Sequence, residues 1–295
     1  MNASHIALVT GANQGLGRAL VEGLAARLHQ DDLVLLTGRN HQRVAEAARE
    51  VALLPGTHAR VEGRVLDVTD TDAIARLAES LRARHGGVDV VISNAVARLL
   101  PEESQAERAD EFIDVSNTAT HAILRSFSPV LRPGGRLLVV ASSLGTLGHL
   151  DPRLHHLFDG ASLEQVEDAV ESWRSAIHHK TAQEAGWPVW LNVPSKVAQV
   201  AAVRALAAER RDRDLATGTL IASVCPGMVD TATSRPWFSD YSGAQSPAQA
   251  AAAVLDLVFA DHVEPGLYGE LVRFGKALPW YDGTPPVEQD RMLTP

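Results

Sequence analysis

A glycine-rich segment near the N-terminus is the first part of the sequence whose residue types indicate a chemical role. Residues 8–17 read Leu-Val-Thr-Gly-Ala-Asn-Gln-Gly-Leu-Gly and lie between a short apolar run and a stretch with helical spacing. Glycines in such a segment let the backbone turn tightly and bring its amides to a pyrophosphate at the positive end of a helix. Because an ordinary glycine turn rarely has this placement, the segment predicts a dinucleotide site. The expected contacts are Gly11, Asn13, Gln14, Gly15, Leu16 and Gly17.

Two positions farther along the chain indicate which dinucleotide is bound. Arg39 follows the second apolar run, at a place where an NAD site usually carries Asp or Glu for the ribose 2′-hydroxyl. An arginine instead accommodates a 2′-phosphate, so the sequence favours NADP, with a solvated surface arginine as the alternative. Asp67 and its neighbour Val68 follow the third run, where the carboxylate could bind the adenine amino group. On its own such an aspartate is more often a helix N-cap.

The elements that must position these residues follow from the pattern of apolar residues. Ala- and Arg-rich stretches with helical spacing, such as Leu16–Leu28 and Ile74–Leu81, alternate with short apolar runs. This alternation indicates buried parallel strands that are covered by helices on both faces. The sequence therefore predicts an α/β fold with a doubly wound, Rossmann-like parallel sheet. The expected strands of its first half are Ile6–Thr10, Leu33–Thr37, Ala59–Leu66, Val88–Ser93 and Arg136–Ala141.

The pattern changes in the second half of the chain. Residues 147–190 have little strand character and look helical only over Ser162–Gln183, so we expect an insertion over one end of the sheet. A Pro-, Ser- and Trp-rich loop at 228–245 is expected to form a substrate lid together with that insertion. Since no repeat or low-complexity linker is present, residues 1–295 are expected to form a single domain. The remaining expected elements are a helix at Val193–Arg213, a strand at Thr219–Val224, a helix at Ala248–Phe259, a strand at Gly266–Phe274 and an extended tail from Pro279.

Composition and charge argue against several classes of partner. A formal net charge of −9 disfavours a nucleic-acid or anionic-membrane surface, which would need clustered Lys and Arg. No apolar run is long enough to span a bilayer and the first residues are too polar for a signal peptide, so a cytoplasmic protein is expected. The one cysteine, Cys225, fits a reducing compartment and is expected to be a small buried residue. The histidine pairs at 155–156 and 178–179 lack partners at metal-ligand spacing, so no metal site is expected.

Three motifs, in order along the chain, resemble those of the short-chain dehydrogenase/reductase family. Residues 10–17 resemble its TGxxxGxG motif, and residues 93–96, Ser-Asn-Ala-Val, resemble its NNAG motif with the first Asn and the Gly replaced. Residues 226–231, Pro-Gly-Met-Val-Asp-Thr, resemble the stretch that holds the nicotinamide. The resemblance covers nearly the whole chain, and the insertion resembles the carbonyl-reductase branch, which implies a monomer and leaves a homodimer open. Further cofactor contacts are implied at Asn94, Ala95, Lys196, Pro226, Gly227, Val229 and Thr231.

The resemblance also implies a catalytic set, which is incomplete at one position. Ser143 matches the serine that polarises the substrate carbonyl, and Asn117 matches the asparagine that anchors a water relay. Lys196 matches the lysine that binds the nicotinamide ribose and lowers the pKa of a tyrosine four residues earlier. That spacing places both side chains on one face of a helix. Here the residue four positions before the lysine is Asn192, and an amide is not a useful proton donor.

Three interpretations follow from this substitution. The favoured one is an NADPH-dependent reductase of a cyclic imine or iminium, because hydride addition to a protonated C=N leaves no alkoxide to protonate; Asn192 would help to orient the substrate. The second keeps carbonyl reduction and takes the proton from a water chain or from another side chain. The candidates for that side chain are His149, Asp151, His155 and Tyr241. The third is a non-redox NADP-binding protein or cyclase, which the presence of Ser143 disfavours.

Tryptophans in the insertion and the loop give the only indication of the substrate. They are Trp173, Trp187, Trp190 and Trp237. They could wall a pocket for an aromatic heterocycle. They could equally pack the insertion against the sheet, so the identity of the small-molecule substrate stays open.

Overall fold

The fold was obtained as a computed structural model, which describes residues 4–281. Over these residues the chain builds one sheet of eight strands in the order β3-β2-β1-β4-β5-β6-β7-β8. All neighbouring strands are parallel except β7 and β8. The strands are β1 (Ile6–Val9), β2 (Leu33–Gly38), β3 (Arg60–Val65), β4 (Val88–Ser93), β5 (Leu131–Val140), β6 (Leu220–Val224), β7 (Leu271–Arg273) and β8 (Lys276–Leu278).

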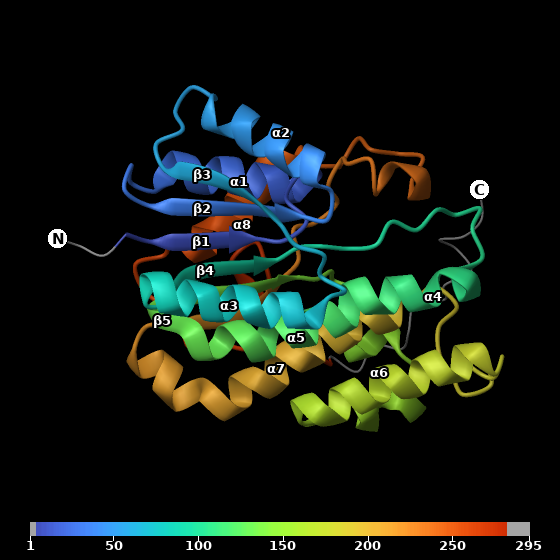
Figure 1. Cartoon of the computed structure of the whole chain (residues 1–295). Coiled ribbons are helices and arrows are strands. Elements are labelled where there is room, and N and C mark those ends of the chain that lie inside the picture. Colours follow the sequence, from blue (N-terminus) through green and yellow to red (C-terminus); the bar gives the residue numbers. More distant parts are fainter. Residues whose placement is uncertain (1–3, 282–295) are drawn as a thin grey trace.

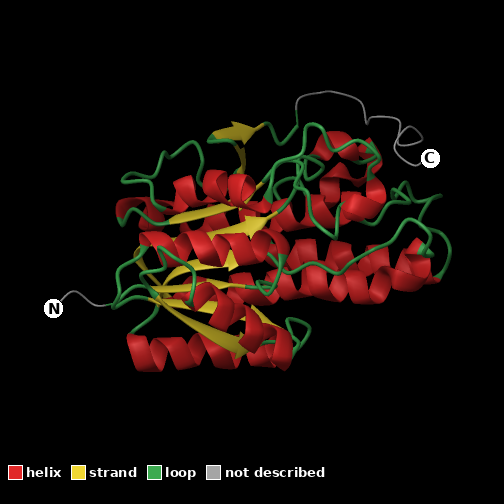
Figure 2. Cartoon of the chain, turned by 90° about the horizontal axis from the view of Figure 1, so that it is seen from above, coloured by secondary structure: helices red, strands yellow, loops and turns green. Residues whose placement is uncertain are grey.

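Helices cover both faces of this sheet (Figure 1, Figure 2). One layer consists of α1 (Gly15–Arg27), α2 (His41–Ala52) and α8 (Pro247–Val258), and the other of α3 (Thr71–His85), α5 (Ala119–Phe127) and α7 (Asn192–Ala216). The strands β1, β2 and β6 are buried along their whole length, as their continuous apolar sequences predict. The predicted doubly wound α/β sheet is therefore confirmed.

The insertion forms a separate small layer outside α7. It contains two short 3₁₀ helices, at Leu147–His149 and Pro152–Leu157, and α6 (Leu163–His178). Ser162 begins α6 with a reciprocal capping box to Gln165, which explains the sharp start of the helix. Helix α6 packs against α7 and against α4 (Gln105–Ile113), so the insertion covers the outer side of these helices.

Three features of the fold differ from the sequence-based expectation. The edge strand β3 is mostly exposed and not buried, because it has a neighbouring strand, β2, on one side only. The last expected strand is shorter, and an antiparallel strand, β8, follows it after a turn in which Phe274 and Gly275 both have positive φ. Helix α3 is capped by Asp70, so the alternative of Asp67 as its cap is wrong. The expected extended tail from Pro279 falls mostly outside the described residues.

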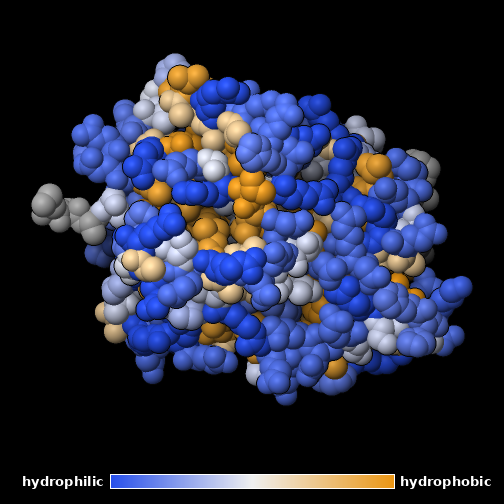
Figure 3. Space-filling model, in the orientation of Figure 1, coloured by the Kyte–Doolittle hydropathy of each residue, from blue (hydrophilic) through white to orange (hydrophobic). Residues whose placement is uncertain are grey.

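The surface is mainly hydrophilic. On the face shown in Figure 3, blue polar side chains surround a band of apolar side chains near the middle of the view. Within residues 4–281, no helix combines the length and the apolar character that crossing a membrane would require.

Candidate active site

The glycine-rich loop is held at the carboxyl ends of β1 and β4 by a compact set of hydrogen bonds. The Thr10 hydroxyl accepts from the backbone N–H groups of Asn94 (2.9 Å) and Ala95 (3.1 Å). The Asn94 amide donates to the carbonyls of Thr10 (2.9 Å) and Gly11 (3.2 Å). A Cβ on Gly11, which has a φ of +61°, would lie 2.8 Å from the Ala95 Cα atom. The two predicted motifs therefore meet, and Asn94 shapes the loop directly.

The N-terminus of α1 is open to an anionic ligand. Gln14 precedes the helix in an extended conformation and makes no side-chain capping bond, and the first turn carries no acidic residue. By contrast, α2, α3, α6 and α8 all have side-chain caps. A Cβ on Gly17 would lie 2.5 Å from the Gly11 carbonyl oxygen, so only glycine allows this close turn. Free amides at a helix N-terminus behind a glycine turn fit a pyrophosphate.

Residues at the ends of β2 and β3 flank this loop. Arg39 is 70% exposed and its guanidinium lies 3.4 Å from a Glu111 carboxylate oxygen, which is a weak surface pair. The Asn13 amide oxygen would lie 3.1 Å from a Cβ on Gly38, so Asn13 faces the end of β2. Asp67 is exposed and accepts bonds from the N–H and hydroxyl of Thr69. Arg39 is thus free to exchange its partner for a phosphate.

The nicotinamide-type motif lies opposite the phosphate loop. A Cβ on Gly15 would be 3.6 Å from the Thr231 methyl group, which brings residues 226–231 next to α1. Gln245 holds this segment: its amide donates to the Pro226 carbonyl (3.1 Å) and its backbone bonds to Met228 and Asp230. The two ends of the predicted cofactor site therefore face one another.

The predicted serine and lysine both lie near the ends of β5 and β6. The Lys196 ammonium donates to the carbonyl of Val140 (3.2 Å), the last residue of β5, and to the Gln199 amide oxygen (2.8 Å). The backbone N–H of Ser143 donates to the Cys225 Sγ atom at 3.2 Å. Burial lowers the pKa of Lys196 to about 8, and an electrostatic contribution from the nearby Cys225 opposes this shift. The lysine is therefore a buried, nearly desolvated ammonium group near the serine segment.

Asn117 lies in a π-helical turn, Asp114–Thr118, between α4 and α5. Its side-chain amide donates to the Ser195 carbonyl at 3.0 Å, next to Lys196 in the chain. Its amide oxygen is buried and has no partner among the described residues. Wide turns of this kind recur at functional sites because they free backbone carbonyls.

Asn192 is the first residue of α7 and is half-buried, one turn before Lys196. Pro194 lies within the first turn, where its missing N–H leaves no unpaired donor. The helix thus begins where the family pattern requires it, and the tyrosine position is occupied by an amide.

Three of the four alternative proton donors already have partners. Asp151 accepts three bonds from Arg153, which lower the pKa of its carboxyl group. The His155 ring bonds to the Leu150 carbonyl (3.2 Å), and His149 bonds to the Thr146 hydroxyl (3.0 Å). The hydroxyl of the fourth, Tyr241, is buried and has no partner among the described residues.

The tryptophans divide into two pairs. Trp173 and Trp187, with ring centroids 6.0 Å apart, are buried inside the insertion and pack it together. Trp190 and Trp237 lie 5.5 Å apart and join the segment before α7 to the loop at 228–245. The Trp237 indole N–H donates to the Leu99 carbonyl at 3.1 Å. Trp190 of the second pair lies two residues before Asn192 in the chain.

Sequence reasoning missed two neighbours of Lys196. Cys225 is buried as expected, but it also contacts the Ser143 backbone. Gln199 was not considered, although a glutamine within the run Val-Ala-Gln-Val-Ala-Ala-Val of a buried helix is a visible signal.

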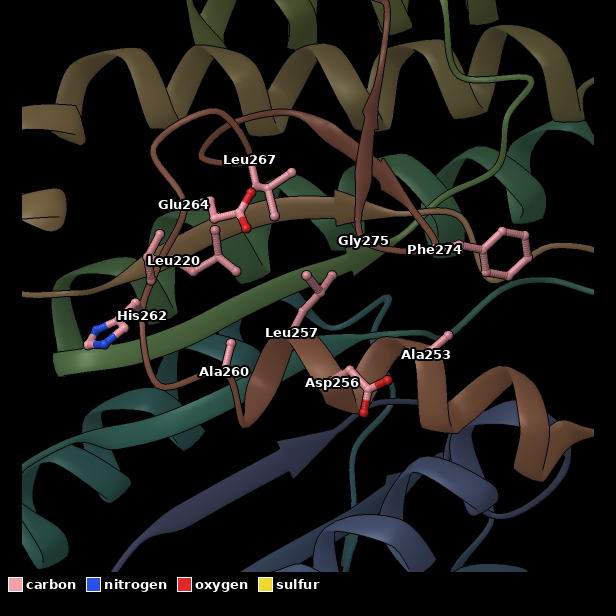
Figure 4. Close-up of a pocket in the computed structure, with 11 residues that line it drawn as sticks. Leu220, Ala253, Asp256, Leu257, Ala260, His262, Glu264, Leu267, Phe274 and Gly275 are labelled. Atoms are coloured by element: carbon pink, nitrogen blue, oxygen red, sulfur yellow. The ribbon is translucent and has the colours of Figure 1, made fainter.

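A cavity of about 370 Å³ lies elsewhere, between α8, β6 and the β7–β8 turn (Figure 4). Its lining includes Asp256, His262, Leu267 and Phe274, and none of the residues predicted for chemistry. Among the residues that the structure describes, no group of three or more His, Cys, Asp or Glu side chains could hold a metal ion.

Comparisons with known proteins agree with this arrangement. A family model described as short chain dehydrogenase matches residues 5–151. Carbonyl reductase [NADPH] 3 of Mus musculus is 28% identical, with 92% of this chain and 97% of the relative covered. Carbonyl reductase [NADPH] 1 of Homo sapiens is also 28% identical, with 94% and 98% covered.

Solved structures show the same fold. Salutaridine reductase from Papaver somniferum superimposes with a TM-score of 0.74 at 20% identity, covering 90% of this chain and 99% of that one. Menthone neomenthol reductase from Mentha piperita gives 0.71, also at 20% identity, covering 92% and 99%. The family model, the carbonyl reductase relatives and the order of motifs along the sheet make the chain a carbonyl-reductase-like member of the short-chain dehydrogenase/reductase family.

Proposed function

We propose that this oxidoreductase uses NADPH to reduce a cyclic imine or iminium. NADP as the cofactor is supported by the names of the carbonyl reductase relatives and by solved structures of the same fold in complex with NADP and NADPH. The uncapped α1 N-terminus and the tight glycine loop fit a pyrophosphate, and the exposed Arg39 fits a 2′-phosphate. When bound, the cofactor supplies a hydride.

The residues of the chain would divide the binding of the cofactor as follows. The loop around Gly11 and Gly17 would hold the pyrophosphate, and Lys196 would donate to the nicotinamide ribose. Val229 and Thr231 would hold the carboxamide, since their segment faces the phosphate loop across Gly15. Contacts at Asp67 and Val68 would hold the adenine. These roles stay proposals.

Asn192 is the observation that carries the choice of substrate. A ketone that accepts a hydride needs a proton on its oxygen, and a positioned acid contributes about 10²–10⁴ in rate. A protonated imine already carries its proton on nitrogen and becomes a neutral amine without any acid. An active site that keeps Ser143 and Lys196 but has an amide at the acid position suits the second substrate. Asn192 and Ser143 would orient the substrate nitrogen.

The alternative acids weaken the case for carbonyl reduction but leave one route open. Asp151 is held as a carboxylate by Arg153, and both candidate histidines have local partners. Tyr241, whose hydroxyl has no partner among the described residues, is the remaining candidate. Carbonyl reduction with Tyr241 as the donor is therefore the second proposal, and the names of the relatives also favour it.

The insertion at 147–190 and the loop at 228–245 would form the lid over the substrate, within a single domain. The contact between Trp190, two residues before Asn192, and Trp237 joins these two segments. A paired aromatic wall at this place suits a planar heterocycle.

The first test follows NADPH oxidation with a panel of cyclic imines and matched ketones, for the wild type and for Asn192→Tyr. We expect the wild type to reduce imines and to reduce the ketones at least about 100-fold more slowly, because the acid is missing. The variant should gain ketone reduction. Binding of NADPH by fluorescence serves as the control for both proteins.

Two outcomes would contradict the proposal. Rapid ketone reduction by the wild type, lost in Tyr241→Phe, would establish the second proposal instead. Silence on every substrate with NADPH still bound would indicate a non-redox protein.

A further inference from the structure

A buried glutamine on α7 contacts the lysine that the proposed function uses. Gln199 is 3% exposed and lies one turn after Lys196, among the Val and Ala residues that face the sheet and α5. Burying a polar group lowers the stability of the folded protein unless its hydrogen bonds are made inside, so the partners of Gln199 indicate its role.

The hydrogen bonds of Gln199 determine its orientation. Its amide oxygen accepts from the Lys196 ammonium at 2.8 Å. Its amide nitrogen donates to the Ser116 carbonyl at 2.7 Å and to the Thr120 hydroxyl at 3.1 Å. The Thr120 hydroxyl itself donates to the Ser116 carbonyl at 2.7 Å, which leaves its oxygen free to accept. Because an ammonium only donates and a carbonyl only accepts, the reversed amide would break two of these bonds.

The same bonds tie the lysine to the π-helical turn that carries Asn117. Gln199 bonds to Ser116 and Thr120, which lie on either side of Asn117 in the chain. Asn117 itself donates to the Ser195 carbonyl of α7. On its other side Lys196 bonds to Val140, at the end of β5. The ammonium is therefore fixed between the sheet and the turn by two neutral acceptors.

We propose that Gln199 is a positioning residue that holds Lys196 as a fixed ammonium and blocks proton transfer between that lysine and the α4–α5 turn. An amide oxygen accepts a hydrogen bond but does not take up the proton near neutral pH, so this branch of the network cannot act as a relay. The role suits this site because Asn192 gives no proton to the substrate, so no relay is needed to supply a new one. The inference rests on the proposed function only for the contact of Lys196 with the cofactor.

The test observes the lysine directly and needs neither substrate nor cofactor. The lysines of the chain are Lys180, Lys196 and Lys276, so ¹⁵Nζ-lysine labelling gives few signals, and Lys196→Arg assigns the buried one. In the wild type, the ammonium protons of Lys196 should exchange with solvent more slowly than those of the exposed Lys180 and Lys276. Exchange of Lys196 as fast as the other two would overturn the proposal without any variant.

Two substitutions separate positioning from mere packing. Gln199→Met fills the space but removes the acceptor, so the titration midpoint of Lys196 should fall by about one to two pH units. Gln199→Glu replaces the acceptor by a carboxylate and should raise the midpoint. A purely structural role would move both midpoints in the same direction, or neither, and would overturn the proposal. Gln42→Met, at an exposed position on α2, is the matched control and should leave the midpoint unchanged.

Binding of NADPH gives an independent second measurement. Gln199→Met should weaken it, since Lys196 is no longer held in place, whereas Gln42→Met should not. A failure of imine reduction in the wild type, with these titrations as expected, would contradict the proposed function and leave the role of Gln199 intact.

Discussion

Lys196 is a charged side chain of the site that folding removes from water without giving it an opposite charge. It is almost fully buried, and both of its acceptors, the Val140 carbonyl and the Gln199 amide, are neutral. Moving an ammonium out of water without an opposite charge favours its neutral form. Burial accordingly lowers the pKa of Lys196 from 10.5 to about 8.

This shift predicts how stability depends on pH. Between pH 8 and 10.5 the unfolded chain still binds a proton at this lysine and the folded chain does not, so the unfolding free energy of the wild type rises with pH. Lys196→Met lacks this dependence. The stability of the variant relative to the wild type should be greatest below pH 8 and should fall by up to about 3 kcal/mol towards pH 10.5. Urea unfolding at a series of pH values measures it.

The exposed Lys276 provides the control for this prediction. The unfolding free energy of Lys276→Met should change with pH as that of the wild type does, because Lys276 is exposed to solvent in both the folded and the unfolded state. A constant difference between Lys196→Met and the wild type from pH 7 to 10 would mean that the folded lysine titrates normally. NADPH binding by Lys196→Met should be lost throughout, since its contact with the ribose is removed.

At the scale of the elements, α5 and α6 enclose a histidine that the proposed chemistry does not use. His121 on α5 is 4% exposed, and its Nδ1 lies 3.8 Å from a Glu167 carboxylate oxygen on α6. That carboxylate is already paired with Arg125 by two hydrogen bonds. Burial lowers the pKa of His121 to about 4, with Glu167 opposing the shift and Arg125 adding to it.

His121 should therefore make the contact between these helices sensitive to acid. From pH 6.5 down to 4 the unfolded chain binds a proton at this position and the folded chain does not, so the unfolding free energy falls by up to about 3 kcal/mol. In His121→Gln the unfolding free energy, measured by urea unfolding, should change less between pH 6.5 and 4 than it does in the wild type. The exposed His156→Gln should keep the wild-type change. Equal slopes for both variants would show that other groups cause the acid sensitivity.

The elements near the cofactor loop could be predicted, because local chemistry dictates them. The glycines at 11, 15 and 17 and the buried apolar strands β1 and β2 each require a particular local conformation, and they lie where the sequence predicts them. The strand β8 could not be predicted, since three residues without an apolar pattern pair only because β7 offers a free edge. The contacts of Gln199 and Cys225 depend on strand order, which periodicity does not reveal.

At the scale of the whole molecule, the C-terminal end of the described chain closes over the insertion. Trp280 follows β8, and its carbonyl accepts from the N–H of Leu147 at 2.9 Å. Its indole N–H donates to Asp159 at 3.1 Å, and Arg204 of α7 lies 5.2 Å above its ring. Trp280 thus links the sheet edge to the insertion and to α7, through its carbonyl at Leu147 and through its side chain at Asp159 and Arg204.

This link predicts that the insertion loosens when the Trp280 ring is removed. Trp280→Ala removes the indole bond to Asp159 and the cation–π contact that holds the ring against Arg204 of α7, together worth about 1–2 kcal/mol. Amides at 147–159 should then exchange with deuterium roughly tenfold faster. Trp280→Phe keeps an aromatic ring under Arg204, so its exchange rate at 147–159 should lie between those of the wild type and Trp280→Ala. Amides of β1 and β2 should be unaffected, since the global core does not depend on this contact. If amides at 147–159 exchanged at the wild-type rate in both variants, the packing of α6 on α7 would be enough to stabilise the insertion, and the Trp280 side chain would contribute nothing to its stability.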